Sequence, residues 1–522
     1  MRNTVFNLRF PRIVPTMAKC VLGILVCSFT SCGNKAENDF PTKPNIVVIL
    51  ADDLGYGDTE VYNDQSKIPT PNINTLAQNG IRFTDAHTPS SVCTPTRYGL
   101  LTGRYAWRTE LKRSVLWAWD RPLIEEDRMT MPKMMKNNGY LTACIGKWHL
   151  GWRWPSKTDG YVNDTIAIGD YGLKGRHDLW REIDFSKTLA GGPLAAGFDY
   201  YFGDDVPNFP PYTFIENNTL LSVPDRVKPD SMYGGPGPMS KGWDLTQVMP
   251  RITKRSVEYI EGQADNDQPF FLYFALTAPH TPIAPTAQFV GKSKAGPYGD
   301  FVHEVDWAVG QIVDALKRSG QLENTVVVFT SDNGSPQRDG TNMGGDIGSV
   351  KKYNHDPSRP YRGIKSHIWE GGHRVPFIIS WPKKIEKGRE SDQLIGLTDL
   401  MATFAGITGN DVKHIKFGDS MDFGSVLVQN VSEPVREDII HHSIDGMFSI
   451  RKGPWKLILG QGSGGWSKLS EKEEGNELLP GQLYNLSEDQ QEKVNLYKEY
   501  PEIVTELRTR LTRYKEQGYS NH

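Results

Sequence analysis

Short, continuous apolar runs recur along most of the chain and are the strongest signal of its fold. Four of them, at residues 45–51, 140–145, 270–275 and 325–330, lack the polar alternation of a half-exposed strand. Such runs are typical of strands that are buried on both faces of a parallel sheet. Helical signals lie between them, including one apolar face over residues 302–316. The alternation predicts an α/β fold with a large, mostly parallel central sheet flanked by helices.

The pattern changes past about residue 430. Three short β-like runs separated by turns come first, at residues 438–442, 447–451 and 455–459. An amphipathic helix is then expected over residues 501–515. We therefore predict a main domain over residues 43–429 and a smaller α+β subdomain, an antiparallel sheet with a terminal helix, over residues 430–522.

The N-terminal segment has the pattern of a targeting signal. Basic residues precede an apolar run at residues 20–27 that is too short to span a bilayer, and no transmembrane helix is expected. The stretch that ends in Ser31-Cys32 resembles a bacterial lipobox, although Phe29 stands where Leu is usual. We interpret residues 1–32 as a signal peptide, with lipidation of Cys32 or plain cleavage as the two alternatives, and residues 33–42 as a flexible tether. Both alternatives predict an exported bacterial protein, either periplasmic or anchored to the outer membrane.

Composition and charge narrow the function classes. The 522 residues are 38% hydrophobic and 23% charged, as in soluble globular proteins. The chain has 59 basic and 62 acidic residues, so it has no basic excess that would indicate nucleic-acid binding. A local basic pocket for an anionic substrate is compatible with this composition. Past the targeting segment only Cys93 and Cys144 remain, so no disulfide framework is expected.

Charged and amide side chains stand directly after the four buried runs. Asp52 and Asp53 come after the first, Lys147 and His149 after the second, His280 after the third, and Asp332 and Asn333 after the fourth. Lys365 lies in a later polar stretch. Since ligand sites of open α/β sheets form at the carboxyl ends of strands, we expect these residues to converge.

Four of these residues offer oxygen atoms alone, as three carboxylates and one carboxamide. Such a set suits a hard cation, so Ca²⁺ is preferred to Zn²⁺. For Asp52 and Asp53 the alternative is a solvated acidic pair in a turn, which needs no ion. The neighbouring Lys and His side chains suit a bound oxyanion, either sulfate or phosphate.

Cys93 opens a predicted helix, with Pro95 in its first turn. A thiol at a helix start is expected to have a lowered pKa and to lie where anions bind. The alternative is a buried structural cysteine. The sequence Cys-x-Pro-x-Arg, followed by Leu101-Thr102-Gly103-Arg104, favours a functional role.

Taken together, six blocks resemble the type I, formylglycine-dependent sulfatases of the alkaline-phosphatase-like superfamily. The blocks are residues 45–57, 93–104, 146–151, 279–282, 331–334 and 365–376, in the family's order. The resemblance covers roughly residues 43–500. The local sequence at residues 199–203 and 298–300 is similar to that of the branch that contains N-acetylgalactosamine-6-sulfatase and arylsulfatase A.

The resemblance implies a cofactor made from the chain itself. Cys93 would be oxidised to formylglycine by a formylglycine-generating enzyme and hydrated, and one of its oxygens would bind the Ca²⁺ held by Asp52, Asp53, Asp332 and Asn333. It also implies roles for the residues around the ion. Arg97 would anchor the modified residue, Lys147 and Lys365 would stabilise the sulfate, His280 would protonate the leaving oxygen, and His149 would take the proton that lets sulfate depart.

The implied activity is hydrolysis of a sulfuric ester on a sulfated carbohydrate. Candidate substrates are glycosaminoglycan or algal polysaccharide fragments, with a 6-sulfate on galactose or N-acetylgalactosamine favoured by the branch. Two alternatives stay open. One is a phosphodiesterase or phosphonate monoester hydrolase of the same superfamily. The other is an inactive protein that binds sulfated glycans, if Cys93 is never oxidised.

Overall fold

The computed structural model describes residues 43–170, 172, 175–410, 418–467 and 479–521. The predicted signal peptide, the tether and Cys32 lie outside the described residues, so these predictions stay open. Among the described residues, no helix combines the length and the apolar character that crossing a membrane requires.

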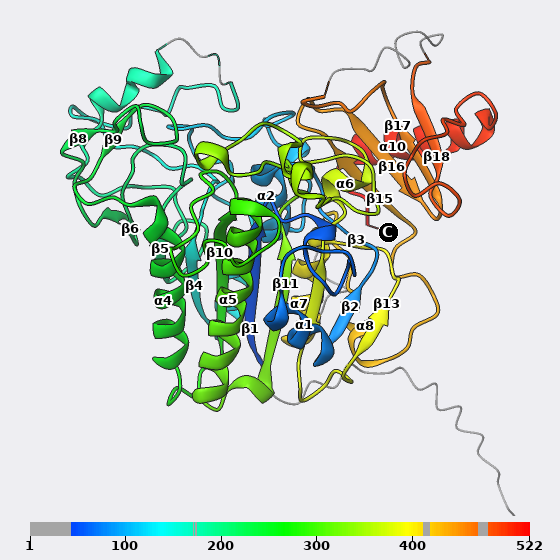
Figure 1. Cartoon of the computed structure of the whole chain (residues 1–522), viewed down its shortest axis with the longest axis horizontal. Coiled ribbons are helices and arrows are strands. Elements are labelled where there is room, and N and C mark those ends of the chain that lie inside the picture. The colour runs from blue at the N-terminus through cyan, green and yellow to red at the C-terminus, as the bar shows by residue number, and fades with distance from the viewer. Residues whose placement is uncertain (1–42, 171, 173–174, 411–417, 468–478, 522) are drawn as a thin grey trace, which may run out of the picture. The chain divides into compact units, whose positions relative to one another are not determined.

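A ten-stranded mixed sheet forms the centre of the fold (Figure 1). Its strands, in spatial order, are β13 (Arg389–Ser391), β2 (Ile81–Phe83), β12 (Phe377–Ser380), β11 (Thr325–Ser331), β1 (Asn45–Asp52), β10 (Phe270–Pro279), β4 (Leu141–Gly146), β5 (Tyr200–Gly203), β6 (Ile215–Glu216) and β7 (Thr219–Leu220). The run from β11 to β5 is parallel throughout. This confirms the predicted large, mostly parallel sheet, and the four apolar runs are its central strands.

Side chains of the central strands enter two separate cores, one on each face of the sheet. In β1, Ile46, Val48 and Leu50 belong to one core, while Val47 and Ile49 belong to the other. This alternation follows from the two-residue period of a strand. Because both faces are covered, the strand has no polar face, and this explains its continuous apolar sequence.

The helices cover both faces (Figure 1). The α-helices are α1 (Pro71–Gln78), α2 (Cys93–Thr102), α3 (Met131–Asn137), α4 (Val248–Glu261), α5 (Gly296–Arg318), α6 (Glu370–His373), α7 (Leu400–Ile407), α8 (Gly424–Val428) and α10 (Pro501–Gln517). Short 3-10 helices are η1 (Tyr56–Asp58), η2 (Ala106–Arg108), η3 (Arg176–Glu182), η4 (Leu245–Gln247), η5 (Leu322–Asn324), η6 (Thr341–Met343), η7 (Ser349–Tyr353) and η8 (Leu397–Asp399). Helices α1, α4 and α5 pack on one core and α2, α3, α7 and α8 on the other.

A separate antiparallel sheet lies near the C-terminus. It consists of β15 (Asp438–His442), β16 (Phe448–Lys452), β17 (Trp455–Ile458) and β18 (Gln482–Asn485), with α10 packed against it. Two small pairs, β3 (Ala86–His87) with β14 (Ile395–Gly396) and β8 (Arg226–Val227) with β9 (Pro238–Met239), complete the strands. The predicted C-terminal sheet and terminal helix are thus confirmed, while the boundary at residues 429 and 430 stays a prediction.

Candidate active site

The carboxyl ends of β1 and β11 bring the predicted oxygen ligands together. The strands are neighbours, with Ala51 paired to Ser331, so Asp52-Asp53 and Asp332-Asn333 follow side by side. The backbone N–H of Asp53 donates to Asp332 Oδ1 over 3.2 Å. The side-chain Nδ2 of Asn333 donates to Asp53 Oδ1 over 2.7 Å. Asp53 holds a left-handed backbone conformation with φ of 71°, which turns the chain sharply at the strand end.

Helix α2 supplies Cys93 and Arg97. Cys93 is its first residue, as the sequence predicts, and Arg97 lies one turn later with no exposed surface. The guanidinium donates from Nε and Nη2 to Asp332 Oδ2 over 3.0 and 2.8 Å, and from Nη1 to the carbonyl of Lys147 over 3.1 Å. Arg97 therefore ties the start of α2 to the ends of β11 and β4.

The expectation of a lowered pKa for the Cys93 thiol is wrong. Burial raises this pKa, and the nearby Lys365 and Lys147 oppose the rise without reversing it. Asp332 and Asp52 add to the rise, because negative charges next to a thiol disfavour the thiolate. The helix start alone does not make Cys93 an acidic thiol.

Three cationic or basic side chains surround the carboxylates. Lys147 Nζ donates to Asp52 Oδ2 over 2.7 Å. Lys365 Nζ donates to both oxygens of Asp53, over 2.6 and 2.8 Å, and lies 3.9 Å from the Cys93 sulfur. His280 Nε2 is 3.7 Å from Asp53 Oδ2, and its Nδ1 contacts the carbonyl of Thr281. If Nδ1 carries the proton, Nε2 faces the carboxylates as a free base.

The electrostatics of the cluster are those of crowded, buried carboxylates. Burial opposes ionisation of Asp52, but Lys147 and then His280 and Arg97 hold its pKa well below the usual range. Burial and the charge of Asp52 raise the pKa of Asp332 to about 7, despite Arg97. Burial and Lys365 lower the pKa of His280 to about 4. Such mutual repulsion is what a bound cation would relieve.

The donor set fits a hard cation. Asp52 Oδ1 and Asn333 Oδ1 are buried and have no hydrogen-bond partner among the described residues. One ligand atom each of Asp52, Cys93 and Asp332 lie within 4.8 Å of one another, as do those of Asp52, Asp53 and His280. Buried polar atoms rarely lack a hydrogen bond, so a buried carboxylate oxygen and a buried amide oxygen without one, in a cluster of carboxylates, point to an ion. Oxygen ligands of this kind suit Ca²⁺.

His149 lies next to the same centre but contacts it through its backbone. Its carbonyl accepts a hydrogen bond from Thr94 Oγ1 over 3.1 Å, next to Cys93. Its ring Nε2 is 2.8 Å from the carbonyl of Leu116, and its buried Nδ1 has no hydrogen-bond partner among the described residues. Burial and Lys147 lower the pKa of this ring well below its ordinary value. A proton on Nε2 would therefore leave Nδ1 as an acceptor.

Two carboxylates near this centre were missed by the sequence reasoning. Asp204 and Asp205 follow β5, and Asp205 Oδ1 accepts from the backbone N–H of His149 over 3.1 Å. Burial raises their pKa values, to about 7 for Asp204 and about 6 for Asp205. The signal that could have found them is an acidic pair directly after a buried strand, as at Asp52 and Asp53.

A sulfatase family model matches residues 44–410 of the chain. The chain belongs to the sulfatase family. It is 31% identical to the N-acetylgalactosamine-6-O-sulfatase of Bacteroides thetaiotaomicron over 92% of this chain and 96% of that protein. It is 28% identical to the N-acetylgalactosamine-6-sulfatase of Mus musculus over 85% and 76% of the two chains. The members of this family are sulfuric ester hydrolases, as the resemblance implied.

Solved sulfatase structures share the fold. One, described for the metabolism of multiple glycosaminoglycans by Bacteroides thetaiotaomicron, superposes with a TM-score of 0.76 at 30% identity and covers 91% of this chain and 99% of its own. A sulfatase from Pseudoalteromonas sp. gives a TM-score of 0.69 at 24% identity over 93% of each chain. The second likeness speaks for the fold alone.

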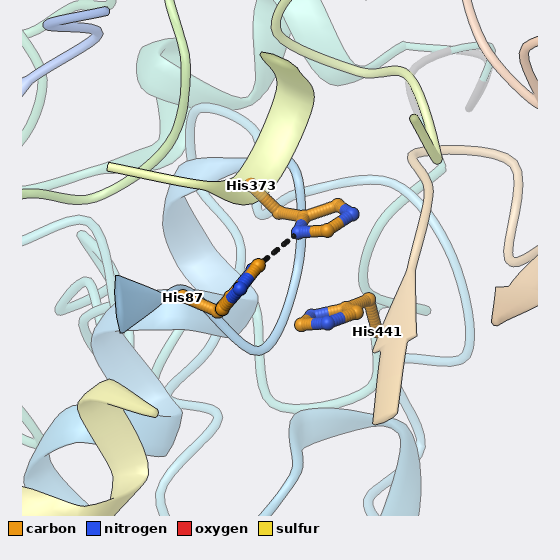
Figure 2. A group of neighbouring side chains, drawn as sticks. All are labelled: His87, His373 and His441. Carbon is orange, nitrogen blue, oxygen red and sulfur yellow. Dashed lines mark hydrogen bonds between the residues drawn. The ribbon is translucent and has the colours of Figure 1, made fainter. Parts of the chain in front are cut away.

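A second buried polar cluster in the sulfatase joins β3 and α6 to the C-terminal sheet (Figure 2). We call His87, His373 and His441, with Asp85, Glu370 and Lys456, the histidine cluster. Lys456 Nζ lies 3.1 Å from His373 Nε2, His373 Nδ1 lies 3.1 Å from His87 Nδ1, and His87 Nε2 lies 2.9 Å from Asp85 Oδ1. These contacts form a continuous hydrogen-bond chain from a lysine to a carboxylate.

The geometry of the histidine cluster does not suit a metal ion, although three ring nitrogens come within 4.8 Å of one another. The rings of His373 and His441 are stacked, with centroids 3.8 Å apart and planes at 13°. Nitrogen lone pairs lie in the plane of the ring, so two stacked rings cannot both direct one at a shared ion. Lys456 would also place a positive charge beside that ion.

Proposed function

We propose that this sulfatase removes sulfate esters from a sulfated carbohydrate, with a formylglycine made from Cys93 as the source of its nucleophile. The observation that carries the proposal is the position of the Cys93 sulfur. It lies 3.9 Å from Lys365 Nζ, which itself binds Asp53, and it is grouped with Asp52 and Asp332. A structural thiol would need neither the cations nor the unpaired oxygens around it.

Conversion of Cys93 by a formylglycine-generating enzyme would supply an aldehyde whose hydrate carries two hydroxyl groups. A Ca²⁺ bound by Asp52, Asp53, Asp332 and Asn333, together with the modified residue 93, would supply positive charge that favours an ionised oxygen nucleophile. Arg97, fixed on Asp332, keeps the start of α2 against this centre. The chain thus holds the attacking residue before any substrate arrives.

Lys147 and Lys365 would bind the sulfate group and stabilise the charge that develops as the ester bond breaks. Both ammonium groups are buried, and each contacts one carboxylate of the centre. Coulombic attraction is stronger away from bulk water, so solvent screens the attraction between these two cations and the transferred sulfate only weakly.

His280 is the proposed proton donor to the leaving sugar oxygen. In the substrate-free protein burial and Lys365 lower its pKa to about 4, which favours the neutral ring. A sulfate ester bound beside the ring brings negative charge and favours the imidazolium, because an opposite charge raises the pKa of a histidine. Substrate binding would in this way help to load the donor.

His149 is the proposed base for the second half of the reaction. When Nε2 donates its hydrogen to the carbonyl of Leu116, Nδ1 is an acceptor. Nδ1 can then take the proton of the second hydroxyl of the hydrate, so that the C–O bond to sulfate breaks, sulfate departs and the aldehyde returns. A serine or cysteine in place of formylglycine has no second hydroxyl and would stay sulfated. This requirement explains why the family converts the residue.

For the substrate we propose a 6-sulfate on galactose or N-acetylgalactosamine within a glycosaminoglycan or algal polysaccharide fragment. Relatives at 31% and 28% identity are named N-acetylgalactosamine-6-sulfatases. Such polymers are extracellular, and this agrees with the export predicted from residues 1–32. The proposed location is the periplasm or, if Cys32 is lipidated, the outer membrane.

The decisive test compares turnover of defined sulfated monosaccharides, an aryl sulfate and an aryl phosphate diester by protein whose residue 93 has been checked by peptide mass spectrometry. We expect sulfate ester hydrolysis to dominate, with the galactose-type 6-sulfates fastest. Equal or faster phosphodiester turnover would favour the phosphodiesterase alternative. Protein with formylglycine at residue 93 that binds sulfated glycans but hydrolyses none would contradict the proposal.

A further inference from the structure

A cleft of about 830 Å³ lies beside the segment that carries the catalytic Lys365. Its wall includes Gly363, Ile364 and His367, which flank Lys365 in sequence. Gln337 also lines it, four residues after Asn333, and its backbone N–H donates to Ser335 Oγ over 2.9 Å. Further parts of the wall come from residues 347–362, from Trp369 and Ser467, and from Gln491 and Lys493 in the segment between β18 and α10. The cleft is therefore built on two loops that also build the active site.

The charge of this cleft is strongly positive. Lys351, Arg359, Arg362 and Lys493 line it, and Asp356 is the one acidic residue among its lining residues. Lys351 Nζ stands 3.8 Å from Asp356, which leaves the other cations in excess. The whole chain carries a net charge of −3, so this concentration of positive charge is local. Clefts lined by one sign of charge attract ligands of the other.

His367 is a buried polar group in this wall that lacks a protein partner. Its side chain is 4% exposed, and neither ring nitrogen has a hydrogen-bond partner among the described residues. Burial and Arg362 lower its pKa to about 4, so near neutral pH the ring offers one donor and one acceptor. A buried polar side chain without a partner requires an explanation, and a ligand in the cleft provides one.

Arg362 and the adjoining aromatic rings are held in fixed positions. The guanidinium lies 3.6 Å from the centroid of the Trp369 ring and donates from Nη1 to the carbonyl of Glu492 over 2.7 Å. Trp369 in turn meets His367 edge-on, with centroids 5.4 Å apart. Fixed aromatic surface with a few convergent polar groups is the usual composition of a small-molecule site.

We propose that this cleft binds a second, anionic sugar of the substrate chain, through a sulfate or carboxylate group, while the sulfate to be hydrolysed lies at Cys93. The proposal rests on the proposed function and deepens it. The exposed cations Arg359 and Lys493 would pair with the anionic group, and His367 would bond to hydroxyl groups of the same sugar. A sulfated oligosaccharide would then bind more tightly than the sulfated monosaccharide that it contains.

The test uses the full-length, formylglycine-containing protein and the double variant Arg359→Ser/Lys493→Ser. We expect hydrolysis of the 6-sulfated monosaccharide to be unchanged within twofold. With a chondroitin 6-sulfate tetrasaccharide we expect KM to rise by about tenfold at unchanged kcat, the scale of two exposed charge contacts. The difference between variant and wild type should shrink as NaCl is raised, since salt screens exposed charges.

The matched control is Lys254→Ser/Lys317→Ser, which removes the same charge from α4 and α5. Lys317 lies at the end of α5, a few residues before β11 begins. It is therefore near the amino end of this strand, whereas the active site is at the carboxyl end. The control should leave both substrates unaffected. A further variant, His367→Leu, should raise KM for the tetrasaccharide without lowering the midpoint of thermal unfolding, because the replaced ring nitrogens bond to no described residue.

Binding of the tetrasaccharide to unconverted Cys93→Ala protein, followed by calorimetry, separates failure of this proposal from failure of the proposed function. Loss of affinity in the Arg359→Ser/Lys493→Ser background supports the cleft even if turnover fails. Equal KM values and equal affinities for wild type and double variant would overturn it. If the carboxylate is the recognised group, a tetrasaccharide with reduced uronic acids should bind wild type and the double variant with equal affinity. If sulfate is recognised, a tetrasaccharide lacking the second sulfate should do so.

Discussion

The active site and the histidine cluster are both buried and charged, yet they differ in the kind of polar atom that lacks a hydrogen-bond partner. In the histidine cluster a hydrogen-bond chain runs from Lys456 to Asp85, and Glu370 pairs with Lys456 over 3.0 Å. The ring nitrogen His441 Nε2 is the one polar side-chain atom of the cluster that lacks a hydrogen-bond partner among the described residues. In the active site two oxygens, Asp52 Oδ1 and Asn333 Oδ1, have no hydrogen-bond partner among the described residues, and Arg97 Nη2 lies 3.6 Å from Asp52 Oδ1. A continuous hydrogen-bond chain stabilises a buried polar network, whereas carboxylate and amide oxygens without hydrogen bonds leave positions for a cation.

Perturbed acidity alone does not separate the two regions. Burial with a neighbouring carboxylate raises the pKa of Asp332 to about 7 in the active site, and the same causes raise that of Glu492, beside Lys456, to about 7. Cations hold the pKa of Asp52 and of Asp85 well below the usual range. Structural ion-pair networks shift pKa values as functional sites do. Oxygen atoms without a hydrogen-bond partner in a cluster of carboxylates are the better criterion.

The largest effect is expected from Cys93→Ala. The variant cannot form an aldehyde, so sulfate ester turnover should fall by at least about 1,000-fold, as for loss of a nucleophile. Because the change removes only the sulfur of a small side chain, the free energy of unfolding should change by no more than about 1 kcal/mol. Kinetics and urea unfolding on the same preparation provide the measurement. Multiple turnover at the wild-type rate would contradict the catalytic assignment.

The opposite pattern is expected from Lys456→Met in the histidine cluster. The change leaves Glu370 and Glu492 buried without their common cation, at a cost of about 3–5 kcal/mol in the free energy of unfolding. Turnover by the folded fraction should stay within twofold of wild type. The control is Lys452→Met, whose exposed pair with Glu506 contributes at most about 1 kcal/mol. Equal losses of stability in both variants would mean that the buried ion pairs of Lys456 contribute no more than the exposed pair of Lys452.

Much of the fold and of the active site was predictable because the relevant signals are local. Continuous apolar runs identify the central strands, and the residues directly after them, such as Asp52 and Asp332, must lie at one edge of a parallel sheet. The active-site residues named from sequence do converge there in the structure.

The remaining features depend on contacts between distant segments, for which a single sequence carries no signal. His87 and His441 are more than 350 residues apart and meet only because β15 of the C-terminal sheet packs beside β3. The raised pKa of Cys93 depends in the same way on how deeply α2 is buried. The helix start is visible in the sequence, but the burial that outweighs it is not.

Removal of Ca²⁺ should lower the free energy of unfolding through the active site and not through the histidine cluster, and by less than Lys456→Met does. Because an ion that binds only the folded state stabilises it by mass action, Ca²⁺ at about 100 times its dissociation constant should add about 2.7 kcal/mol to the free energy of unfolding of chelator-treated protein. Asn333→Ala should weaken this gain, since Asn333 supplies one of the unpaired oxygens. Lys456→Met should show the full gain. Stabilisation by Zn²⁺ that His441→Phe abolishes would show instead that the histidine cluster binds metal.

The smallest effect concerns the pH dependence of stability, measured in His441→Phe. Burial, then His87 and Lys456, lower the pKa of His441 well below 6.5 in the folded state. As the pH falls below 6.5, the unfolded chain takes up a proton at this residue that the folded chain does not, so stability is lost from pH 6.5 down to the folded pKa. The phenylalanine can keep the stack on His373 but has no proton to bind.

Urea unfolding of His441→Phe between pH 7 and pH 5 should therefore show a stability profile that is shallower than that of wild type by about 1.4 kcal/mol per pH unit, the value for one proton. The variant also loses the contact of Nδ1 with the carbonyl of Thr88, so it should be the less stable protein at pH 7, and the gap should narrow as the pH falls. Activity at pH 7 should be unchanged, because the cluster touches no active-site group. Parallel profiles would mean that His441 is protonated in the folded protein, and the histidine cluster would then carry a charge that the hydrogen-bond chain from Lys456 to Asp85 does not accommodate.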